Sequence, residues 1–186
     1  MSHIMLSEIA SEVKPIYHLY IDMDGVIADF DGGFEKISGG LSSKEYASKY
    51  GKSAFWKLVA SKKSAFFSNL EWMPDGKILW DFCWWLPQLH EKPTILTATG
   101  GDTRECANGK NEWIRKNIQG NPKVLFGKSS EKHVGIISPI AKKNEIFILI
   151  DDRPKNIDPW NAAGGIGILH TDAASTISTL KEIILQ

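Results

Sequence analysis

Five short apolar runs, separated by segments with helical periodicity, constrain the fold of this 186-residue chain more than any other feature. The runs expected to be strands are 16–21, 94–97, 123–126, 146–150 and 166–169. The helices expected between and after them run from Pro74, from Asp102 or Thr103 to Ile118, from Pro154, and over 174–184. Such alternation is typical of a parallel sheet covered by helices on both faces. We therefore predict an α/β fold with a Rossmann-like parallel sheet.

The segment that begins at Pro74 has the clearest helical pattern. Its apolar residues recur at spacings of three and four, and they are Ile78, Leu79, Phe82, Trp85, Leu86 and Leu89. This spacing predicts one apolar face turned toward the strand at Thr94. The tryptophans Trp80, Trp84 and Trp85 are expected to lie in the core.

Residues 30–72 do not fit the alternation of strands and helices. The segment is rich in Gly, Ser and Lys, and helical fragments are visible only around 44–49 and 55–60. It exceeds by far the usual connection of about 2 to 6 residues. We predict a small helical cap here, inserted after the first strand into a core domain of residues 1–29 and 73–186. The alternative, that its aromatic residues only pack the insertion onto the core, stays open.

Acidic side chains follow two of the predicted strands. The first strand runs into Asp22 and Asp24. The fourth runs into Asp151 and Asp152, with Asn156 four residues beyond the second of them. Ligands of open parallel sheets bind at the carboxyl ends of the strands, and closely spaced carboxylates cannot all stay ionised without compensation. We predict Mg²⁺ held by oxygen ligands at this edge, although any single acid could instead cap a helix.

A hydroxyl side chain ends the second predicted strand. Thr97 is expected to project at the same edge, followed by Gly100 and Gly101. A hydroxyl beside free backbone N–H groups at a helix start can bind an anion. Taken alone, helix capping explains much of this pattern.

The composition excludes several classes of protein. With 42% hydrophobic and 24% charged residues, the chain is long enough for one globular core. Lys plus Arg and Asp plus Glu both number 22, so no net charge attracts nucleic acid or an anionic membrane. Cys83 and Cys106 match neither a disulfide framework nor a zinc motif, and we expect both to be small buried residues. No apolar run approaches the roughly 18 residues of a membrane span, which predicts a cytoplasmic protein.

Taken together, these motifs resemble those of the haloacid dehalogenase superfamily of phosphohydrolases. In order, they are DMDGV, a hydroxyl residue ending a later strand, a downstream Lys, and DD with a polar residue four positions on. The strings DMDGVIADF, FWKL, FFSNLEWMPDG and LIDDRPKNI are similar to the 5'(3')-deoxyribonucleotidase group within that superfamily. The resemblance extends from residue 17 to residue 170 and is weaker between 100 and 145.

The resemblance implies a Mg²⁺-dependent phosphomonoesterase. Asp22 would attack phosphorus to form an aspartyl-phosphate, while Asp24 would protonate the leaving oxygen and then activate the hydrolytic water. Mg²⁺ would be bound by the Asp22 carboxylate, the Asp24 backbone carbonyl and the Asp152 carboxylate. Asp151 and Asn156 would support these ligands.

The resemblance implies that one group of residues binds the phosphate of the substrate and another contacts its base. Thr97 would hold a phosphate oxygen. The family commonly follows this Thr with Ser and has a Lys four residues after it. This chain has Ala98, which we expect to contact the substrate, and Gly101, so part of the phosphate grip is missing or replaced. Phe30 and Trp56 match the aromatic positions that face the base, where stacking is worth roughly 1 to 3 kcal/mol.

The lysine of the third motif is not fixed by the sequence. At the position where the family's lysine precedes the DD pair, this chain has Ala141. We choose Lys132, because SSEKH follows the third strand much as the family's lysine loop does, and Lys128, Lys142 and Lys143 remain alternatives. One of the four is expected to neutralise the nucleophile and the phosphate.

Three functions are consistent with the sequence. The first is dephosphorylation of (deoxy)nucleoside monophosphates. The second is the same chemistry on a sugar phosphate, another metabolite phosphate or a polynucleotide end, the last of which would need a basic groove. The third is a phosphate- or Mg²⁺-binding module without turnover. The expected partner is a small phosphorylated substrate, with no nucleic acid and no membrane, and a homodimer is left open.

Overall fold

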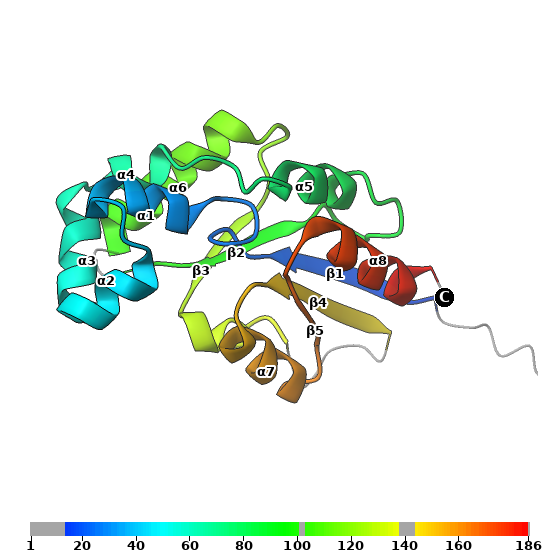
Figure 1. Ribbon diagram of the computed structural model, residues 1–186. Coiled ribbons are helices and arrows are strands. Elements are labelled where there is room, and N and C mark those ends of the chain that lie inside the picture. The colour runs from blue at the N-terminus through cyan, green and yellow to red at the C-terminus, as the bar shows by residue number, and fades with distance from the viewer. Residues whose placement is uncertain (1–13, 101–102, 138–143, 186) are drawn as a thin grey trace, which may run out of the picture.

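The computed structural model describes residues 14–100, 103–137 and 144–185. Within these ranges the chain forms a five-stranded, all-parallel sheet in the order β3-β2-β1-β4-β5 (Figure 1). The strands are β1 (Ile16–Ile21), β2 (Thr94–Ala98), β3 (Val124–Gly127), β4 (Glu145–Asp151) and β5 (Ile166–Leu169). The predicted α/β fold with a parallel sheet is confirmed.

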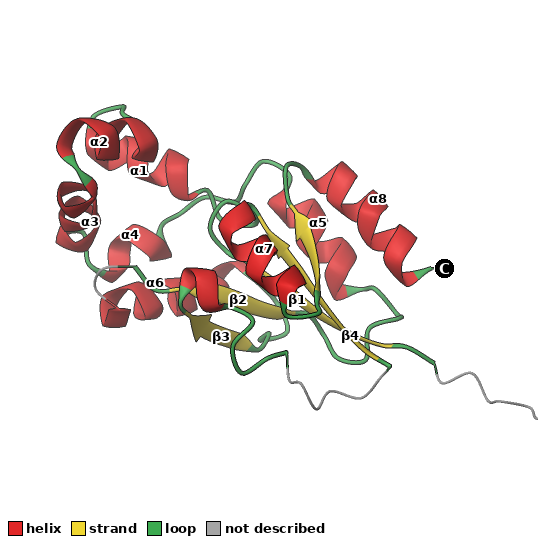
Figure 2. Ribbon diagram, turned by 90° about the horizontal axis from the view of Figure 1, so that it is seen from below, coloured by secondary structure: helices red, strands yellow, loops and turns green. Residues whose placement is uncertain are grey.

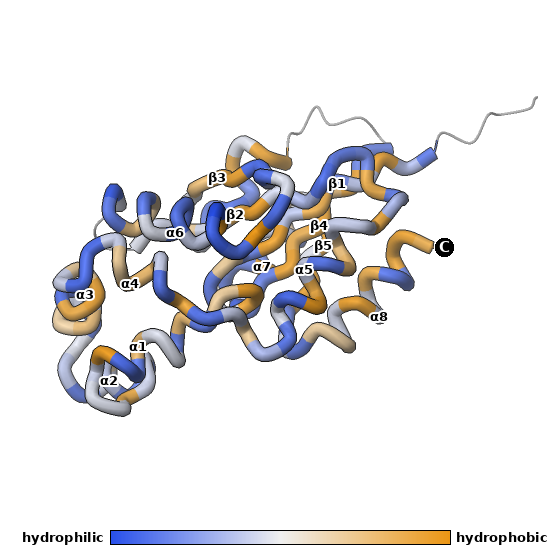
Figure 3. Tube along the Cα trace, turned by 90° about the horizontal axis from the view of Figure 1, so that it is seen from above, coloured by the Kyte–Doolittle hydropathy of each residue, from blue (hydrophilic) through white to orange (hydrophobic). Residues whose placement is uncertain are grey.

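Helices cover both faces of this sheet (Figure 2). On one face lie α5 (Gly76–Trp84), α6 (Thr103–Asn117) and α8 (Ala173–Ile184), which pack with β1 side chains such as Leu19 and Ile21. On the other face, α7 (Pro154–Ala162) packs with Leu96 and Leu149. Because side chains alternate along a strand, each strand supplies both layers, and β4 is hydrophobic along most of its length (Figure 3).

Four short helices follow β1 before the chain enters α5. They are α1 (Phe30–Ser38), α2 (Ser43–Tyr50), α3 (Lys52–Ser61) and α4 (Ser64–Ser68). In Figure 1 they lie together beyond the carboxyl edge of the sheet. Buried side chains of this segment, among them Phe34, Phe55 and Phe66, belong to the same hydrophobic core as buried residues of α5 and α6. Packing is therefore one role of its aromatic residues.

Two of these helices, α1 and α4, lie outside the fragments expected from the sequence. Gly32 and Gly33 lower the helix propensity of α1, but Asp29 accepts from the Gly32 N–H at its start and Gly39 ends it with φ 79°. The N–H of Ser64 in α4 donates to the carboxylate of Glu105 in α6. A five-residue helix supported from another element gives no local sequence signal.

The prediction of which residues form the buried face of the helix after Pro74 is wrong in part. The buried residues of α5 are Gly76, Leu79, Trp80 and Cys83. By contrast, Ile78 is 64% exposed and Trp85, just after the helix, is 73% exposed. Lys77 and Asp81 are the only charged residues of this nine-residue helix, so its apolar spacing allows more than one buried stripe, and packing against the sheet and α8 selects one.

Both cysteines expected to be buried, Cys83 and Cys106, are buried. In the part of the chain that the structure describes, no helix has the length and apolar character needed to cross a membrane.

Candidate active site

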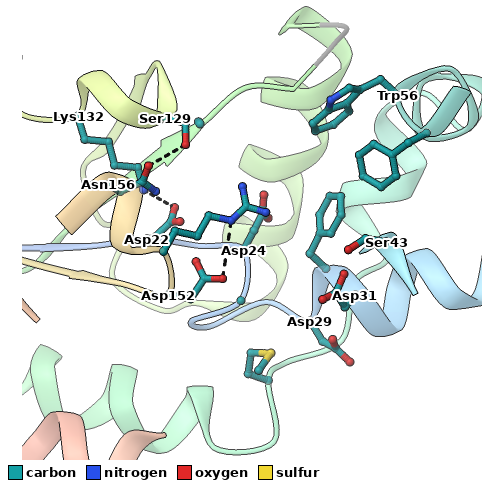
Figure 4. A pocket seen from close by; sticks show the side chains of 16 residues that line it. Asp22, Asp24, Asp29, Asp31, Ser43, Trp56, Ser129, Lys132, Asp152 and Asn156 are labelled. Atoms are coloured by element: carbon teal, nitrogen blue, oxygen red, sulfur yellow. Dashed lines mark hydrogen bonds and ion pairs between the residues drawn. The ribbon is translucent and has the colours of Figure 1, made fainter. Parts of the chain in front are cut away.

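The carboxyl ends of β1, β2 and β4 border a cavity of about 310 Å³. Asp22, Asp24 and Asp152 line it from the sheet. Phe30 and Trp56 line it from the segment that contains α1 and α3. Figure 4 shows Asp22 and Asp152 on one side of the cavity and Trp56 on the opposite side. The site thus has an acidic end on the sheet and an aromatic end on the helical segment.

Asp22 is held firmly at the end of β1. Its N–H donates to the carbonyl of Ile150 at 2.9 Å, which extends the pairing of β1 with β4. Its Oδ1 accepts from the Met23 N–H at 2.8 Å and lies 2.8 Å from Nζ of Lys132. The side chain of Asp22 is 9% exposed and lines the cavity.

Lys132 follows the short 3-10 helix η1 (Ser129–Glu131) and bridges two acids. Besides contacting Asp22, its Nζ donates to Asp151 Oδ2 at 2.6 Å. Burial alone would lower the pKa of Lys132, but the carboxylates of Asp22 and Asp151 raise it above its usual value. Among the alternative lysines, Lys128 is 81% exposed and pairs with Glu131, while 142 and 143 lie outside the described residues.

Asp151 is enclosed by donors. Its two oxygens accept from the Asn156 amide at 2.8 and 2.9 Å, from the Arg153 N–H at 3.0 Å and from Lys132. Pro154 starts α7 directly after this turn, which aims Asn156 back at the strand end. Since its oxygens are occupied, Asp151 serves to hold Lys132 and Asn156 in place.

The donor set fits a divalent cation. Oxygens of Asp22, Asp151 and Asp152 all lie within 4.8 Å of one another. Oδ1 of Asp152 is buried without a hydrogen-bond partner among the described residues. Burial, together with the charges of Asp22 and Asp151, raises the pKa of Asp152 to about 7. A cation bound by Asp22 and Asp152 would satisfy this oxygen and relieve the repulsion, and hard oxygen ligands suit Mg²⁺ or a similar ion. The Asp24 carboxylate lies outside this cluster, and coordination by the Asp24 carbonyl stays a prediction.

Gly25 allows the loop after β1 to pass Asp152. It adopts φ +80°, and a Cβ built there would lie 2.6 Å from Oδ2 of Asp152. Any larger residue would meet both the strained backbone and the carboxylate. The glycine of DMDG is thus explained by local geometry.

Lys110, which the sequence analysis missed, contacts Asp24. Its Nζ lies 2.8 Å from Asp24 Oδ2 and donates to Oγ1 of Thr97 at 2.7 Å and to the carbonyl of Ala98 at 2.8 Å. Burial raises the pKa of Asp24, and the charge of Lys110 partly offsets this. The available signal was a lysine four residues after Cys106 and three before Trp113, on the buried stripe of α6.

The remaining predicted residues differ in their position. Thr97 is fully buried and does not line the cavity, so its contact with phosphate stays a prediction. Ala98 does line the cavity, as do the rings of Phe30 and Trp56, whose centroids are 6.5 Å apart. The structure adds further cavity-lining side chains that the sequence analysis did not select, namely Asp29, Asp31, Ser43, Phe55, Met73, Ser129 and Arg153.

Comparison with known proteins gives a fold and no family. No protein-family model and no curated protein sequence matches the chain. Among solved structures, the chain is similar to a hydrolase from Streptococcus pneumoniae TIGR4, with 16% sequence identity and a TM-score of 0.50. The similarity covers 91% of this chain and 99% of the other. At this identity the similarity establishes a shared fold.

Proposed function

We propose that the protein is a Mg²⁺-dependent phosphomonoesterase of the haloacid dehalogenase type, acting through an aspartyl-phosphate on (deoxy)nucleoside monophosphates. One observation carries the proposal. Asp22, fixed through Oδ1 by a buried lysine, faces a cavity beside Asp152, whose Oδ1 has no hydrogen-bond partner among the described residues. The hydrolase from S. pneumoniae that shares the fold is consistent with it.

In the first step, an oxygen of Asp22 attacks the phosphorus of the substrate. A bond forms between this oxygen and phosphorus while the bond from phosphorus to the leaving oxygen breaks, and Asp24 gives that oxygen its proton. Lys132, 2.8 Å from Asp22, offsets the negative charge that gathers on the nucleophile and the phosphate. Mg²⁺ held by Asp22 and Asp152 would supply the positive charge that lets a phosphate dianion approach a carboxylate.

In the second step, Asp24 acts as a base. It takes a proton from a water molecule whose oxygen attacks phosphorus, and the bond from phosphorus to Asp22 breaks. Inorganic phosphate leaves and the Asp22 carboxylate is regenerated. Asp24 has then given up one proton and taken up another, so it returns to its initial protonation state.

The aromatic end of the cavity favours a nucleotide. Trp56 lies across the cavity from Asp22 and Asp152, and the ring of Phe30, which also lines the cavity, has its centroid 6.5 Å from that of Trp56. Stacking on such rings contributes roughly 1 to 3 kcal/mol per base. A volume of about 310 Å³ is at the small end of the usual range for small-molecule sites.

A sugar phosphate is the second candidate substrate. Asp29, Asp31 and Ser43 line the cavity on the same side as Trp56 in Figure 4 and offer oxygens to sugar hydroxyls.

The test is phosphate release from a panel of 5' and 3' (deoxy)nucleoside monophosphates and sugar phosphates, with Mg²⁺ or with EDTA. We expect release from nucleotides that needs Mg²⁺ and disappears in Asp22→Asn. Asp81→Asn, which removes an exposed carboxylate from α5, is the matched control and should keep full activity. Release from sugar phosphates alone would mean that the substrate is a sugar phosphate and not a nucleotide. No release from any compound would contradict the proposed function.

A further inference from the structure

Lys110 brings a positive charge into the interior of the molecule. Of the lysines that the structure describes, Lys110 and Lys132 are the buried ones, and Lys110 is 1% exposed. A buried ammonium group is costly unless it is paired and hydrogen-bonded. The proposed reaction assigns no role to this residue, so its position needs another explanation.

Each hydrogen of the Lys110 ammonium group has an acceptor. An ammonium group has three N–H donors, and the three acceptors are Asp24 Oδ2, Thr97 Oγ1 and the Ala98 carbonyl, at 2.7 to 2.8 Å. The ring of Phe67 lies 5.3 Å from Nζ, within the range of a cation–π contact. Lys110 does not line the cavity, so it can act on a substrate only through the groups it holds.

The contact with Lys110 makes the two oxygens of Asp24 unequal. Oδ2 is bound to Nζ at 2.8 Å, whereas Oδ1 is buried without a hydrogen-bond partner among the described residues. The same ammonium group also binds the last two residues of β2. Lys110 therefore ties the loop after β1 to the end of β2 and fixes the carboxylate between them.

We propose that Lys110 is a positioning residue for the reaction. By holding Oδ2 of Asp24, it fixes the orientation of the carboxylate that gives a proton to the leaving group and later takes one from water. This inference rests on the proposed function. It assigns to α6, an element outside the motifs, control over how Asp24 is oriented.

The kinetic test compares Lys110→Met with Lys116→Met. Methionine keeps much of the side-chain volume and removes the charge and the donors, and Lys116 is a half-exposed lysine on the same helix. We expect Lys110→Met to lower kcat about 100-fold with little change in KM, because misplacing a reacting group by about 1 Å costs a factor of that order. Lys110→Arg, which keeps the charge and donors, should recover part of the loss. Lys116→Met should behave as the wild type.

Two kinetic results would overturn the proposal. A higher KM with unchanged kcat would mean that Lys110 binds substrate. An unchanged kcat per folded molecule, with a lower melting temperature, would mean that Lys110 only stabilises the fold. The measurements therefore include thermal unfolding of each variant, and Lys110→Arg carries the test if Lys110→Met does not fold.

A second readout does not depend on turnover. Crystal structures of the Lys110 and Lys116 variants without substrate show the side chain of Asp24 directly. The proposal requires Asp24 to change its rotamer or occupy more than one in Lys110→Met and to keep its position in Lys116→Met. If Asp24 stays in place without Lys110, the proposal is wrong, whether or not the wild type hydrolyses any phosphate ester.

Discussion

Because Gly25 has no side chain, the loop after β1 can lie against Asp152. The loop after β1 and the end of β4 approach so closely that a Cβ at Gly25 would lie 2.6 Å from Asp152 Oδ2. The site therefore depends on a residue that carries no chemistry of its own. Gly164 offers a comparison, because it has φ +94° and no atom within 4 Å of a Cβ built there.

Replacing Gly25 with Ala should weaken metal binding. A left-handed backbone costs a residue with a side chain about 1 to 2 kcal/mol, so Gly164→Ala should lose about that much unfolding free energy in urea. Gly25→Ala should lose at least as much, because its Cβ also meets Asp152. Only Gly25→Ala also displaces Asp152, and its Mg²⁺ affinity, measured by titration calorimetry, should fall. Equal Mg²⁺ affinity in the two variants would show that Asp152 does not bind the ion.

Among the elements, α6 connects the helical segment to the sheet. Glu105 in α6 accepts from the Ser64 N–H of α4, and Nε1 of Trp113 donates to the carbonyl of Leu70 at 2.7 Å. Lys110, between these two contacts, binds Asp24. Side chains of α6 therefore contact both α4 and the end of β2.

Replacing Gly109 with Ala should destabilise this packing. In a helix interior Ala is usually better than Gly by roughly 0.5 to 1 kcal/mol. Here a Cβ would lie 2.3 Å from the backbone oxygen of Ser64 and 2.9 Å from Cβ of Phe67, and overpacking of this kind costs about 1 to 3 kcal/mol. We expect a net loss of unfolding free energy in urea, while the control Asn111→Ala, exposed on the same helix, should be neutral or stabilising. A more stable Gly109→Ala would mean that α4 can move away from α6 at little cost.

For the molecule as a whole, a metal ion bound at the acidic edge would stabilise the folded protein. A ligand that binds only the folded state stabilises it by about 2.7 kcal/mol at 100 times its dissociation constant. In EDTA, by contrast, the carboxylates of Asp22, Asp151 and Asp152 repel one another, and this repulsion contributes to the raised pKa of Asp152.

Thermal unfolding should show this linkage. Mg²⁺ should raise the melting temperature of the wild type and leave that of Asp152→Asn unchanged. In EDTA, Asp152→Asn should be at least as stable as the wild type, because the substitution removes one of the repelling charges. An equal rise with Mg²⁺ in both proteins would place the stabilising ion elsewhere.

The strands and the acidic positions were predictable because their signals are local. A buried parallel strand is a short apolar run, and a carboxylate directly after such a run must lie at the sheet edge where the other strands also end. The pattern of α5 was local too, but a helix whose only charged residues are Lys77 and Asp81 permits more than one buried stripe. The stripe through Trp80 and Cys83 was chosen by the elements around it.

The contacts that orient the acids came only from the tertiary structure. Lys110 and Asp24 are 86 residues apart in the chain, and the choice of Lys132 among several lysines rested on an analogy of position. A lysine on a helix is ordinarily a solvated surface residue, and nothing in its immediate neighbours states which carboxylate it will meet. The sequence by itself determined where the acids lie in the sheet, because apolar periodicity reports burial. Which lysines pair with these acids was decided only by the packing of α6 and η1 against the strand ends, because an ion pair depends on distance in space and not along the chain.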